Sequence, residues 1–323
     1  MELVTKKRLQ LYTGRAHPEL AEEIAQHLGV QLGNANVRSF ANGELWCQFD
    51  ESIRGSDVFI IQTHSGNVNE SIMEQCVLLD AAKRGSAKRI TAVCPYYAYG
   101  RQDRKAENRT PITAKLVADM LTVAGADRMV SVDLHSGQIQ GFFDKPVDHL
   151  TAMPVLLDYL KPYAGDDLVI VSPDAGRVRV AERFAQHVGA DIAFVHKRRP
   201  KGTKNQVEAK SVIGDVDGRR CVIVDDMIDT AGTIVAAAEI LKQEGATDVW
   251  CMATHGILSD PAVDRLKNSE FSKVVITNTL PLPSEKQIDK IEVLSIAPLF
   301  ARTIDAIFED TSVSDIFGGE HLS

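Results

Sequence analysis

The stretch CVIVDDMIDTAGT, residues 221–233, decides how this 323-residue chain folds. Apolar residues at 221–224 run directly into Asp225 and Asp226, and a third acid, Asp229, precedes a Thr-Ala-Gly-Thr turn. A short, continuous Val/Ile-rich run is typical of a strand that is buried on both faces of a parallel sheet. Ligands of such sheets bind beyond the carboxyl ends of the strands. The stretch therefore predicts a parallel α/β sheet with a ligand at the end of this strand.

The turn that follows the strand is predicted to bind phosphate. It opens the next helix, where backbone N–H groups and the positive end of the helix dipole favour an anion. Ala231 and Gly232 are small enough for a ligand to approach the backbone, and Thr230 and Thr233 add hydroxyl donors.

The two adjacent acids require a different partner. Asp225 and Asp226 cannot bind phosphate, but their oxygens can accept hydrogen bonds from the hydroxyl groups of a sugar. A sugar that carries a phosphate would satisfy both halves of the motif. The alternative is a helix whose N-terminus is capped by Asp and Thr side chains. Capping explains one Asp and one Thr, whereas the stretch has three acids within five residues.

Similar apolar runs recur along the chain and alternate with helical patterns. The helical patterns at 69–85 and 233–245 each end on glycine, a common C-terminal stop. This alternation predicts mostly parallel sheets that are flanked by helices. The predicted strands are 56–62, 89–97, 128–135, 167–174, 219–226 and 247–255.

The chain also contains an internal repeat. Residues 58–97 and 221–254 both run strand, loop, helix, glycine, strand. Only the second copy carries the acids and the Thr-Ala-Gly-Thr turn, because the first has THSGNVNES in that place. Pro146 and Pro154 interrupt the chain between the copies. We therefore predict two similar α/β domains, residues 1–150 and 151–323.

Composition limits the classes of function. The chain is 44% hydrophobic and 25% charged, as in ordinary globular proteins, and its net charge of -8 argues against nucleic-acid binding. Its five scattered cysteines form no CxxC pair, which predicts buried thiols in a reducing cytosol and neither disulfides nor a zinc site. The N-terminus has no apolar signal-peptide region, and no apolar run is long enough to cross a membrane. We expect a cytoplasmic protein without membrane or nucleic-acid partners.

Five further motifs carry a resemblance to a known family. They are FANGE (40–44), YYAYGRQDRK (96–105), VDLHSGQIQGFFDKPVD (132–148), VSPDAGR (171–177) and HKRRP (196–200). Together with VIVDDMIDTAGT, which resembles the phosphoribosyl-diphosphate signature of type I phosphoribosyltransferases, they make the chain similar to class I ribose-phosphate diphosphokinases, also called phosphoribosyl pyrophosphate synthetases. Members of that family have two phosphoribosyltransferase-like halves. The implied reaction transfers the diphosphoryl group of ATP to the anomeric hydroxyl of ribose 5-phosphate. The products are phosphoribosyl diphosphate, for nucleotide biosynthesis, and AMP.

The resemblance implies a role for each matching residue of the sugar and metal sites. Asp225 and Asp226 match the sugar-binding acids. The loop that binds the 5-phosphate corresponds to Asp229, Thr230, Ala231, Gly232 and Thr233. The family often has glycine where Ala231 stands, so we expect ordinary backbone angles there, because alanine adopts a positive φ only at a cost. His135 and Asp174 match the Mg²⁺ positions. Their alternatives are a hydrogen-bonded histidine at a strand end and a turn residue before Gly176.

The same resemblance implies the nucleotide and catalytic residues. Lys197 and Arg199, in the basic stretch KRRPKGTK (197–204), match the catalytic pair, and Arg199 also matches a ribose 5-phosphate contact. The alternative for this stretch is an exposed, solubilising loop, and RQDRK in the ATP motif could likewise be a solvated charged loop. The residues implied for ATP are Phe40, Asn42, Gly43, Glu44, Arg101, Gln102 and Asp103.

Regulation and assembly are expected only through the resemblance. Members of the family's common class are activated by phosphate and inhibited by ADP at a subunit interface, and they form homohexamers. The matching residues are Ser52, Arg54, Arg84, Ser86, Ser312, Ser314 and Phe317. The alternative function is a non-catalytic, synthetase-associated regulatory protein. A plain phosphoribosyltransferase would leave the first 150 residues unexplained.

Overall fold

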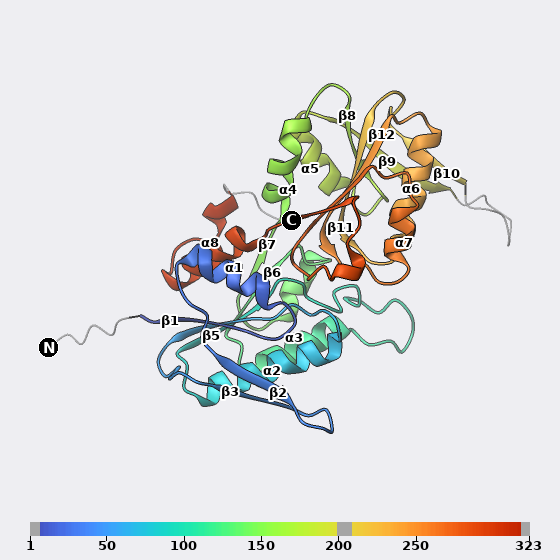
Figure 1. Cartoon of the computed structure of the whole chain (residues 1–323). Coiled ribbons are helices and arrows are strands. Elements are labelled where there is room, and N and C mark those ends of the chain that lie inside the picture. Colours follow the sequence, from blue (N-terminus) through green and yellow to red (C-terminus); the bar gives the residue numbers. More distant parts are fainter. Residues whose placement is uncertain (1–6, 199–208, 318–323) are drawn as a thin grey trace. The chain divides into compact units, whose positions relative to one another are not determined.

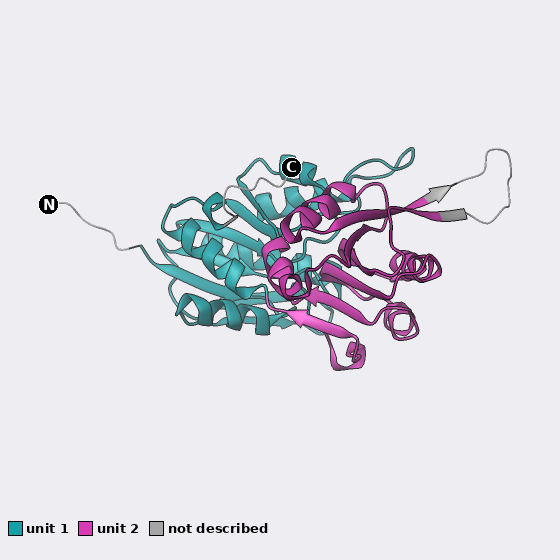
Figure 2. Cartoon of the chain, turned by 90° about the horizontal axis from the view of Figure 1, so that it is seen from above, with its two compact units in different colours: residues 1–151, 279–281, 296–323 teal, residues 152–278, 282–295 magenta. Residues whose placement is uncertain are grey.

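The computed structural model describes residues 7–198 and 209–317 of the chain (Figure 1). These residues form two compact units, which Figure 2 shows in different colours. Unit 1 is drawn from residues 1–151, 279–281 and 296–323, and unit 2 from residues 152–278 and 282–295. The sequence predicted domains 1–150 and 151–323. In the structure, the last segment of the chain, from residue 296 onward, groups with unit 1 and not with unit 2.

The reason for this difference is the last long helix, α8 (Ala297–Phe308). It packs against α1 (Pro18–Leu28) within unit 1. Leu299, Phe300 and Ile304 of α8 are at most 1% exposed, so the helix completes the core of unit 1. The pairing joins residues that are far apart in sequence, and no local pattern predicts it.

Unit 1 is built on a parallel sheet. Within the described residues the strand order is β1-β4-β5-β6-β7, and every neighbouring pair is parallel. Helices α1 and α8 lie on one face of this sheet and α2 and α3 on the other (Figure 1). An antiparallel hairpin of β2 and β3 packs against α2. The bounds are β1 Leu9–Thr13, β2 Ala35–Ser39, β3 Leu45–Phe49, β4 Asp57–Ile61, α2 Val68–Arg84, β5 Arg89–Cys94, α3 Thr113–Ala124, β6 Arg128–Val132, η1 Gly137–Phe142 and β7 Val147–Leu150.

Unit 2 is built on a larger sheet. Its described strands follow the order β10-β9-β8-β11-β12-β13-β14, and all neighbours are parallel except β9 and β10. Helices α4 and α5 pack together, as do α6 and α7. The bounds are α4 Met153–Leu160, η2 Lys161–Tyr163, β8 Leu168–Ser172, α5 Val178–Val188, β9 Asp191–Arg198, β10 Ala209–Ile213, β11 Arg220–Ile228, α6 Gly232–Gln243, β12 Asp248–Gly256, α7 Ala262–Lys267, β13 Lys273–Thr277, η3 Ser284–Lys286 and β14 Ile291–Leu294.

The predicted fold class is confirmed. Each of the six predicted strands is present in a parallel pairing, and β4 and β8 are buried at every position, as the lack of alternation indicated. The internal repeat is present as β4–α2–β5 in unit 1 and β11–α6–β12 in unit 2. In both copies the two strands are parallel neighbours. Among the described residues, no helix combines the length and the apolar character needed to cross a membrane.

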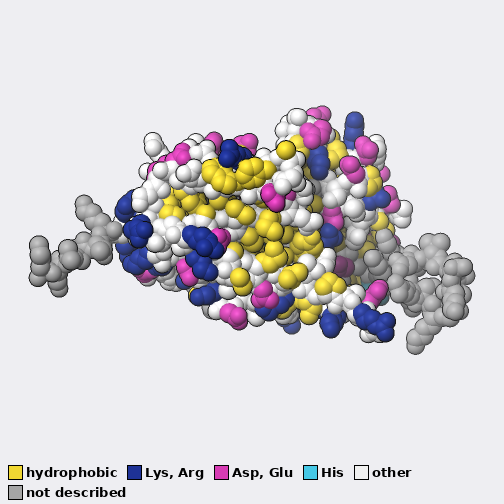
Figure 3. Space-filling view, turned by 90° about the horizontal axis from the view of Figure 1, so that it is seen from below, with side chains coloured by type: hydrophobic (Ala, Val, Ile, Leu, Met, Phe, Trp, Pro, Cys, Tyr) yellow, Lys and Arg dark blue, Asp and Glu magenta, His cyan; other side chains and the backbone are white. Residues whose placement is uncertain are grey.

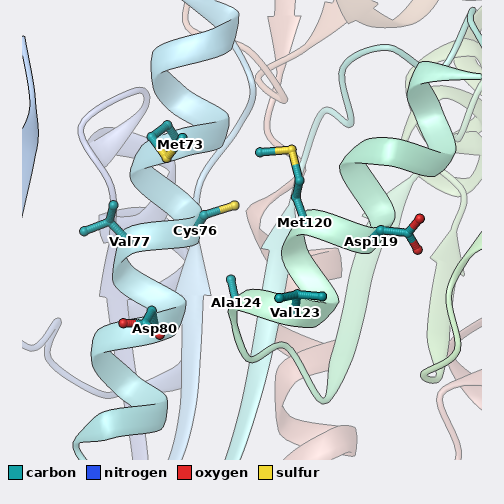
Figure 4. A pocket seen from close by; sticks show the side chains of 8 residues that line it. All are labelled: Met73, Cys76, Val77, Asp80, Asp119, Met120, Val123 and Ala124. Atoms are coloured by element: carbon teal, nitrogen blue, oxygen red, sulfur yellow. The ribbon is translucent and has the colours of Figure 1, made fainter. Parts of the chain in front are cut away.

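The surface of unit 1 has an apolar groove of about 560 Å³ between α2 and α3. Cys76 of α2 and Met120 of α3 point toward each other across it (Figure 4). Met73 and Val123 at the groove are 48% and 76% exposed. Hydrophobic side chains are also gathered on the face of the molecule that Figure 3 shows. The sequence motifs predicted no site in this groove.

Candidate active site

The predicted sugar-binding acids lie where β11 passes beyond one of its neighbours. β11 pairs with β8 only as far as Ile223, opposite Val171, but it pairs with β12 through Asp225 and on to Ile228. The carboxyl-end half of β11 therefore has a paired edge toward β12 and an edge that faces the loop after β8. Asp225 and Asp226 fall in this half, at the end of the strand where a ligand is expected.

The loop after β8 supplies a cation that the sequence analysis did not single out. Arg177 forms an ion pair with Asp226 through Nη2 and Oδ2, and its Nε lies 3.6 Å from Oδ1 of Asp225. The side chain of Asp226 is only 5% exposed. A carboxylate this buried needs a partner, because removing a charge from water is costly. Arg177 therefore offsets part of the negative charge of the acid pair and holds the two side chains in place.

Burial raises the pKa of Asp225, and the charge of Asp226 raises it further. A hydrogen bond with the side chain of Asp226 also raises this pKa. The backbone N–H of Asp226, which donates to Oδ1 of Asp225 at 2.8 Å, lowers it, as does the positive charge of Arg177. The two acids and one arginine thus form an electrostatically coupled group. Its carboxylate oxygens are well suited to accept hydrogen bonds from sugar hydroxyls.

The backbone at Ala231 corrects one expectation. Ala231 has φ 60° and ψ 1°, in the left-handed region, so the prediction of ordinary angles at this position was wrong. The 229–233 turn has to reverse the chain between β11 and α6 within a few residues. A left-handed residue allows this and turns successive backbone N–H groups toward one side, as in anion-binding nests. Alanine accepts the strain because the surrounding structure fixes the turn.

The 229–233 turn also favours a ligand over simple capping. Helix α6 begins at Gly232 with Ala231 as its N-cap, and alanine has no side-chain acceptor for the first helical N–H groups. Thr230 and Thr233 are exposed. From α7, Nη1 of Arg265 donates to the carbonyl of Thr230 at 2.9 Å and supports the turn from outside.

Asp174 acts as a turn residue before Gly176, which was the alternative to its predicted metal-binding role. Its Oδ1 accepts hydrogen bonds from the backbone N–H groups of Gly176 at 2.8 Å and Arg177 at 3.2 Å. These bonds shape the turn that leads into α5 and brings Arg177 to the acids. The residue is exposed, and its role toward a metal stays a prediction.

His135 follows β6 in unit 1 and is half-buried. A Cβ at Gly100 would lie 3.3 Å from the Cβ of His135 and 3.5 Å from the carbonyl oxygen of Tyr97. Glycine therefore lets the 96–105 segment approach His135 closely, and Tyr99 assists the bend with φ 61°. The structure thus brings the candidate nucleotide segment next to the candidate metal histidine. Among the described residues, no three His, Cys, Asp or Glu side chains gather as a metal site.

The other nucleotide residues occupy the turn of the β2–β3 hairpin. Backbone bonds join Phe40 to Glu44 at 2.8 Å and Gly43 to Phe40 at 2.9 Å, and Gly43 has φ 89°. Oδ1 of Asn42 accepts a 3.2 Å bond from the N–H of Glu44. The ring of Phe40 remains 47% exposed, which suits a ring that stacks on a base.

The second nucleotide segment is anchored to α3. Oε1 of Gln102 accepts a hydrogen bond from the hydroxyl of Thr113, and its carbonyl accepts one from the N–H of Ala114. Arg101 and Gln102 are exposed, and Asp103 is half-buried. RQDRK thus lies at the surface, as expected for the alternative of a solvated charged loop, but Gln102 fixes it to α3.

The predicted catalytic pair is only partly within the described residues. Lys197 lies in the backbone of β9, in register with Lys210 of β10. Arg199 lies outside the described residues, as do residues 200–204 of the predicted 197–204 loop.

The segments that carry four predicted effector residues lie together at the amino-terminal end of the unit 1 sheet. The N–H of Gly55 donates to the carbonyl of Ser86 at 2.9 Å, and a Cβ at Gly85 would lie 2.6 Å from Cδ1 of Ile53. The loop before β4 therefore lies directly against the loop before β5. These two loops carry Ser52, Arg54 and Ser86, and Arg84 is the last residue of α2.

The segment before the C-terminal effector residues is tied to the start of β5. Asp310, two residues after α8, forms ion pairs with Lys7 and with Arg89, the first residue of β5. Ser312 lies two residues after Asp310. Ser314 begins η4 (Ser314–Phe317), whose last residue is Phe317. The structure thus brings together segments that are more than 200 residues apart.

Comparison with known proteins identifies the family. Residues 9–125 match the model of the N-terminal domain of ribose phosphate pyrophosphokinase, and residues 197–318 match that of the phosphoribosyl synthetase-associated domain. The chain is 55% identical over 313 residues to a ribose-phosphate pyrophosphokinase of Streptomyces coelicolor, covering 97% of both chains. It is 52% identical over 317 residues to that of Mycobacterium leprae, covering 98% of this chain and 97% of the relative.

A solved structure agrees. The phosphoribosylpyrophosphate synthetase of Mycobacterium smegmatis superposes with a TM-score of 0.89 at 53% identity, covering 94% of this chain and 100% of that one. The resemblance drawn from the sequence motifs is confirmed. The chain is an enzyme that belongs to the ribose-phosphate pyrophosphokinase family of transferases.

Proposed function

We propose that this enzyme transfers the β,γ-diphosphoryl group of ATP to ribose 5-phosphate. The anomeric oxygen of the sugar bonds to the β-phosphorus and loses its proton, while the bond from that phosphorus to the α,β-bridging oxygen breaks. The products are phosphoribosyl diphosphate and AMP. The observation that carries the proposal is the pair Asp225–Asp226 directly before a left-handed turn at the N-terminus of α6.

The proposed ribose 5-phosphate site uses both parts of this arrangement. The carboxyl oxygens of Asp225 and Asp226 accept hydrogen bonds from the ring hydroxyls, and Arg177 holds the pair in place and favours its charged form. The N–H groups and hydroxyls of the 229–233 turn hold the 5-phosphate, aided by the dipole of α6. Together these contacts fix the anomeric oxygen for attack, because positioning dominates phosphoryl transfer.

The proposed nucleotide site uses the 40–44 turn for adenine and residues 101–103 for the phosphates. Phe40 presents its exposed ring for stacking, and the guanidinium of Arg101 can bind phosphate oxygens in a fixed fork. Lys197 and Arg199 are proposed to stabilise the negative charge that develops during transfer, and removal of one such donor typically costs about 10²–10³-fold in rate.

Mg²⁺ is the proposed metal, with His135 and Asp174 as its protein contacts. Mg²⁺ binds through few carboxylates, keeps several waters and is completed by substrate phosphates. The exposed carboxylate of Asp174 fits such a site. When bound, the ion neutralises charge on the ATP phosphates.

Phosphate and ADP are proposed as effectors at a site formed by Ser52, Arg54, Arg84 and Ser86 with Ser312, Ser314 and Phe317. A homohexamer is proposed as the assembly, and the cytoplasm as the location, where the five free cysteines would stay reduced. Titration with phosphate at fixed free Mg²⁺ tests the effector site. The proposed effector site is refuted if phosphate changes neither the activity nor the inhibition by ADP.

The decisive assay supplies ATP, Mg²⁺ and ribose 5-phosphate and measures AMP. We expect AMP only when the sugar is present, and none when Mg²⁺ is removed with a chelator. Asp225→Asn and Asp226→Asn, assayed above the raised pKa of Asp225, should raise the KM for ribose 5-phosphate by at least about tenfold, because each removes a charged acceptor. Asp215→Asn, at an exposed acid of unit 2 outside the site, serves as the control. Wild-type protein that forms no AMP under any condition would refute the proposal.

A further inference from the structure

The loop after β1 contains an arginine that joins α2 to the β2–β3 hairpin. Arg15 comes two residues after the end of β1. Its Nε donates to Oε2 of Glu74 at 2.6 Å, and its Nη2 donates to Oε1 of Glu70 at 3.1 Å. Both glutamates belong to α2, and Nη1 and Nη2 of Arg15 each lie 3.4 Å from the hydroxyl of Ser39 in β2.

The contact with Glu74 fixes the arginine firmly. Glu74 is only 2% exposed. Its Oε1 accepts a 2.6 Å bond from the backbone N–H of Arg15 and a 3.0 Å bond from Nε2 of Gln62. The same carboxylate thus binds Arg15 at both its main chain and its side chain. Charge-assisted bonds of this kind are strong, and the buried carboxylate needs its cation.

The contact with Ser39 lies at the end of the hairpin that carries the nucleotide residues. Ser39 pairs with Leu45 in the last rung before the 40–44 turn. The other end of the hairpin is held elsewhere, where the rings of Phe49 and Tyr12 are 4.5 Å apart. The contact between Arg15 and Ser39 joins the hairpin to the rest of unit 1 at the rung next to Phe40.

We propose that Arg15 is a positioning residue for the 40–44 turn, and so for ATP. This inference rests on the proposed nucleotide role of Phe40, Asn42 and Glu44. A two-stranded hairpin is marginally stable by itself, and an unsecured turn would lose conformational freedom each time it bound a ligand. Arg15 removes this cost in advance, because Glu74 anchors its guanidinium and Ser39 is the residue directly before Phe40.

Two variants test this role without removing the buried ion pair. Ser39→Ala deletes the hydroxyl and leaves Arg15 and Glu74 intact, so failure to fold is not expected. Arg15→Lys keeps a cation for Glu74 but cannot also reach Ser39 with a planar fork. Asn36→Ala is the matched control, because Asn36 lies in β2 and its side chain bonds Asp50 at 2.7 Å, away from the turn.

We expect Ser39→Ala and Arg15→Lys to raise the KM for ATP by about three- to tenfold, as loss of a modest hydrogen bond would. The KM for ribose 5-phosphate should stay within about twofold, and Asn36→Ala should change neither constant by more. Binding of a non-hydrolysable ATP analogue to the same proteins, measured by calorimetry, should weaken by the same factor as the KM for ATP rises.

The inference is overturned if both variants bind the analogue like wild type, or if the two KM values rise together. A change in melting temperature with unchanged nucleotide affinity would likewise reduce Arg15 to a structural residue. Wild-type protein that binds the analogue but forms no AMP refutes the proposed reaction instead, and the binding comparison still decides the role of Arg15. Wild-type protein that does not bind the analogue overturns both.

Discussion

The charge balance around Asp225 and Asp226 explains both their stability and their proposed use. Two adjacent carboxylates in a largely buried strand repel each other, and burial penalises each negative charge. Arg177 offsets this by pairing with Asp226 and lying near Asp225. The sequence analysis did not predict this cation, and only the fold identified it, because Arg177 is 48 residues from Asp225 in the sequence.

The raised pKa of Asp225 predicts how sugar binding depends on pH. An ionised carboxylate accepts hydrogen bonds from hydroxyls at both oxygens, whereas a protonated one has less acceptor capacity. Affinity for ribose 5-phosphate should therefore increase as the pH rises through the raised pKa of Asp225. Arg177→Gln removes a charge that lowers this pKa, so the increase should move to higher pH.

Calorimetric titration with ribose 5-phosphate between about pH 6 and pH 9 measures this effect, the range being set by the size of pKa shifts at buried acids. Asp225→Asn is the control, because it retains the titration of the ligand's own phosphate and loses only the contribution of the carboxyl. An Arg177→Gln profile that coincides with wild type, or moves to lower pH, would contradict the role given to Arg177.

The left-handed angles of Ala231 predict opposite results for two small substitutions. Ala231→Gly should retain ribose 5-phosphate binding and change the free energy of unfolding by no more than about 1 kcal/mol, because relief of strain is offset by greater freedom of the unfolded chain. Ala231→Val should weaken binding by at least about tenfold, because a β-branched residue is a genuine outlier at positive φ. Chemical denaturation and calorimetry measure both quantities. Equal affinity of the Gly and Val variants would show that the backbone of this turn does not determine binding.

At the scale of elements, the two copies of the repeat differ in how their helices begin. In unit 1, Asn67 caps α2, and its side chain accepts a 3.4 Å bond from the N–H of Glu70. In unit 2, the N-cap of α6 is Ala231, which has no acceptor. No side chain at the N-cap of α6 accepts a bond from its first N–H groups, which can therefore bind a ligand. In α2, by contrast, the side chain of Asn67 accepts a bond from one of the first N–H groups. This difference explains why only the second copy is expected to hold phosphate.

The segment that ends α8 is held by charge. Hydrogen bonds from Lys7 and Arg89 lower the pKa of Asp310 to about 2. Because the folded-state pKa lies below the ordinary value of 3.8, this group stabilises the fold above that value and loses its effect as the pH falls toward about 2. Asp310→Asn should therefore lower the free energy of unfolding at pH 7, and the difference from wild type should shrink below about pH 4.

Denaturant unfolding at several pH values checks this prediction. Asp305→Asn removes an exposed carboxylate from α8 itself and is the matched control. A difference between Asp310→Asn and wild type that is constant with pH, or equal to that of the control, would contradict the proposed contribution of the ion pairs.

At the scale of the whole molecule, unit 1 is completed by the last helix of the chain. Phe300 of α8 is fully buried, so Phe300→Ala should destabilise unit 1 by about 3–5 kcal/mol through loss of apolar contacts and the cavity left behind. The chain has two tryptophans, Trp46 in unit 1 and Trp250 in unit 2, which report on the units separately.

Thermal unfolding followed by fluorescence in Trp250→Phe and Trp46→Phe backgrounds tests this prediction. Phe300→Ala should lower the transition seen by Trp46 more than that seen by Trp250. Phe271→Ala, at a residue of unit 2 that is 1% exposed, should show the reverse order. Equal shifts of both probes in both variants would mean that the units unfold together, contrary to this prediction.

The sequence by itself determined the fold class, the central strands, the repeat and the family. These features depend on continuous apolar runs, glycine stops and ordered motifs, which are local and therefore readable along the chain. The hairpin of β2 and β3 and the strands β1, β7, β9, β10, β13 and β14 were not predicted. Several of these strands are only partly buried, so their residues lack a continuous apolar run.

Only the tertiary structure decided the contacts between distant segments. It placed Arg177 against the acids, Arg15 between Glu74 and Ser39, and α8 in unit 1. It also gave Ala231 a backbone conformation that its residue type argues against. The physical reason is the same in each case. Ion pairs, packed helices and strained turns are stabilised by neighbours that the chain brings near only when it folds, so their partners cannot be read from local sequence.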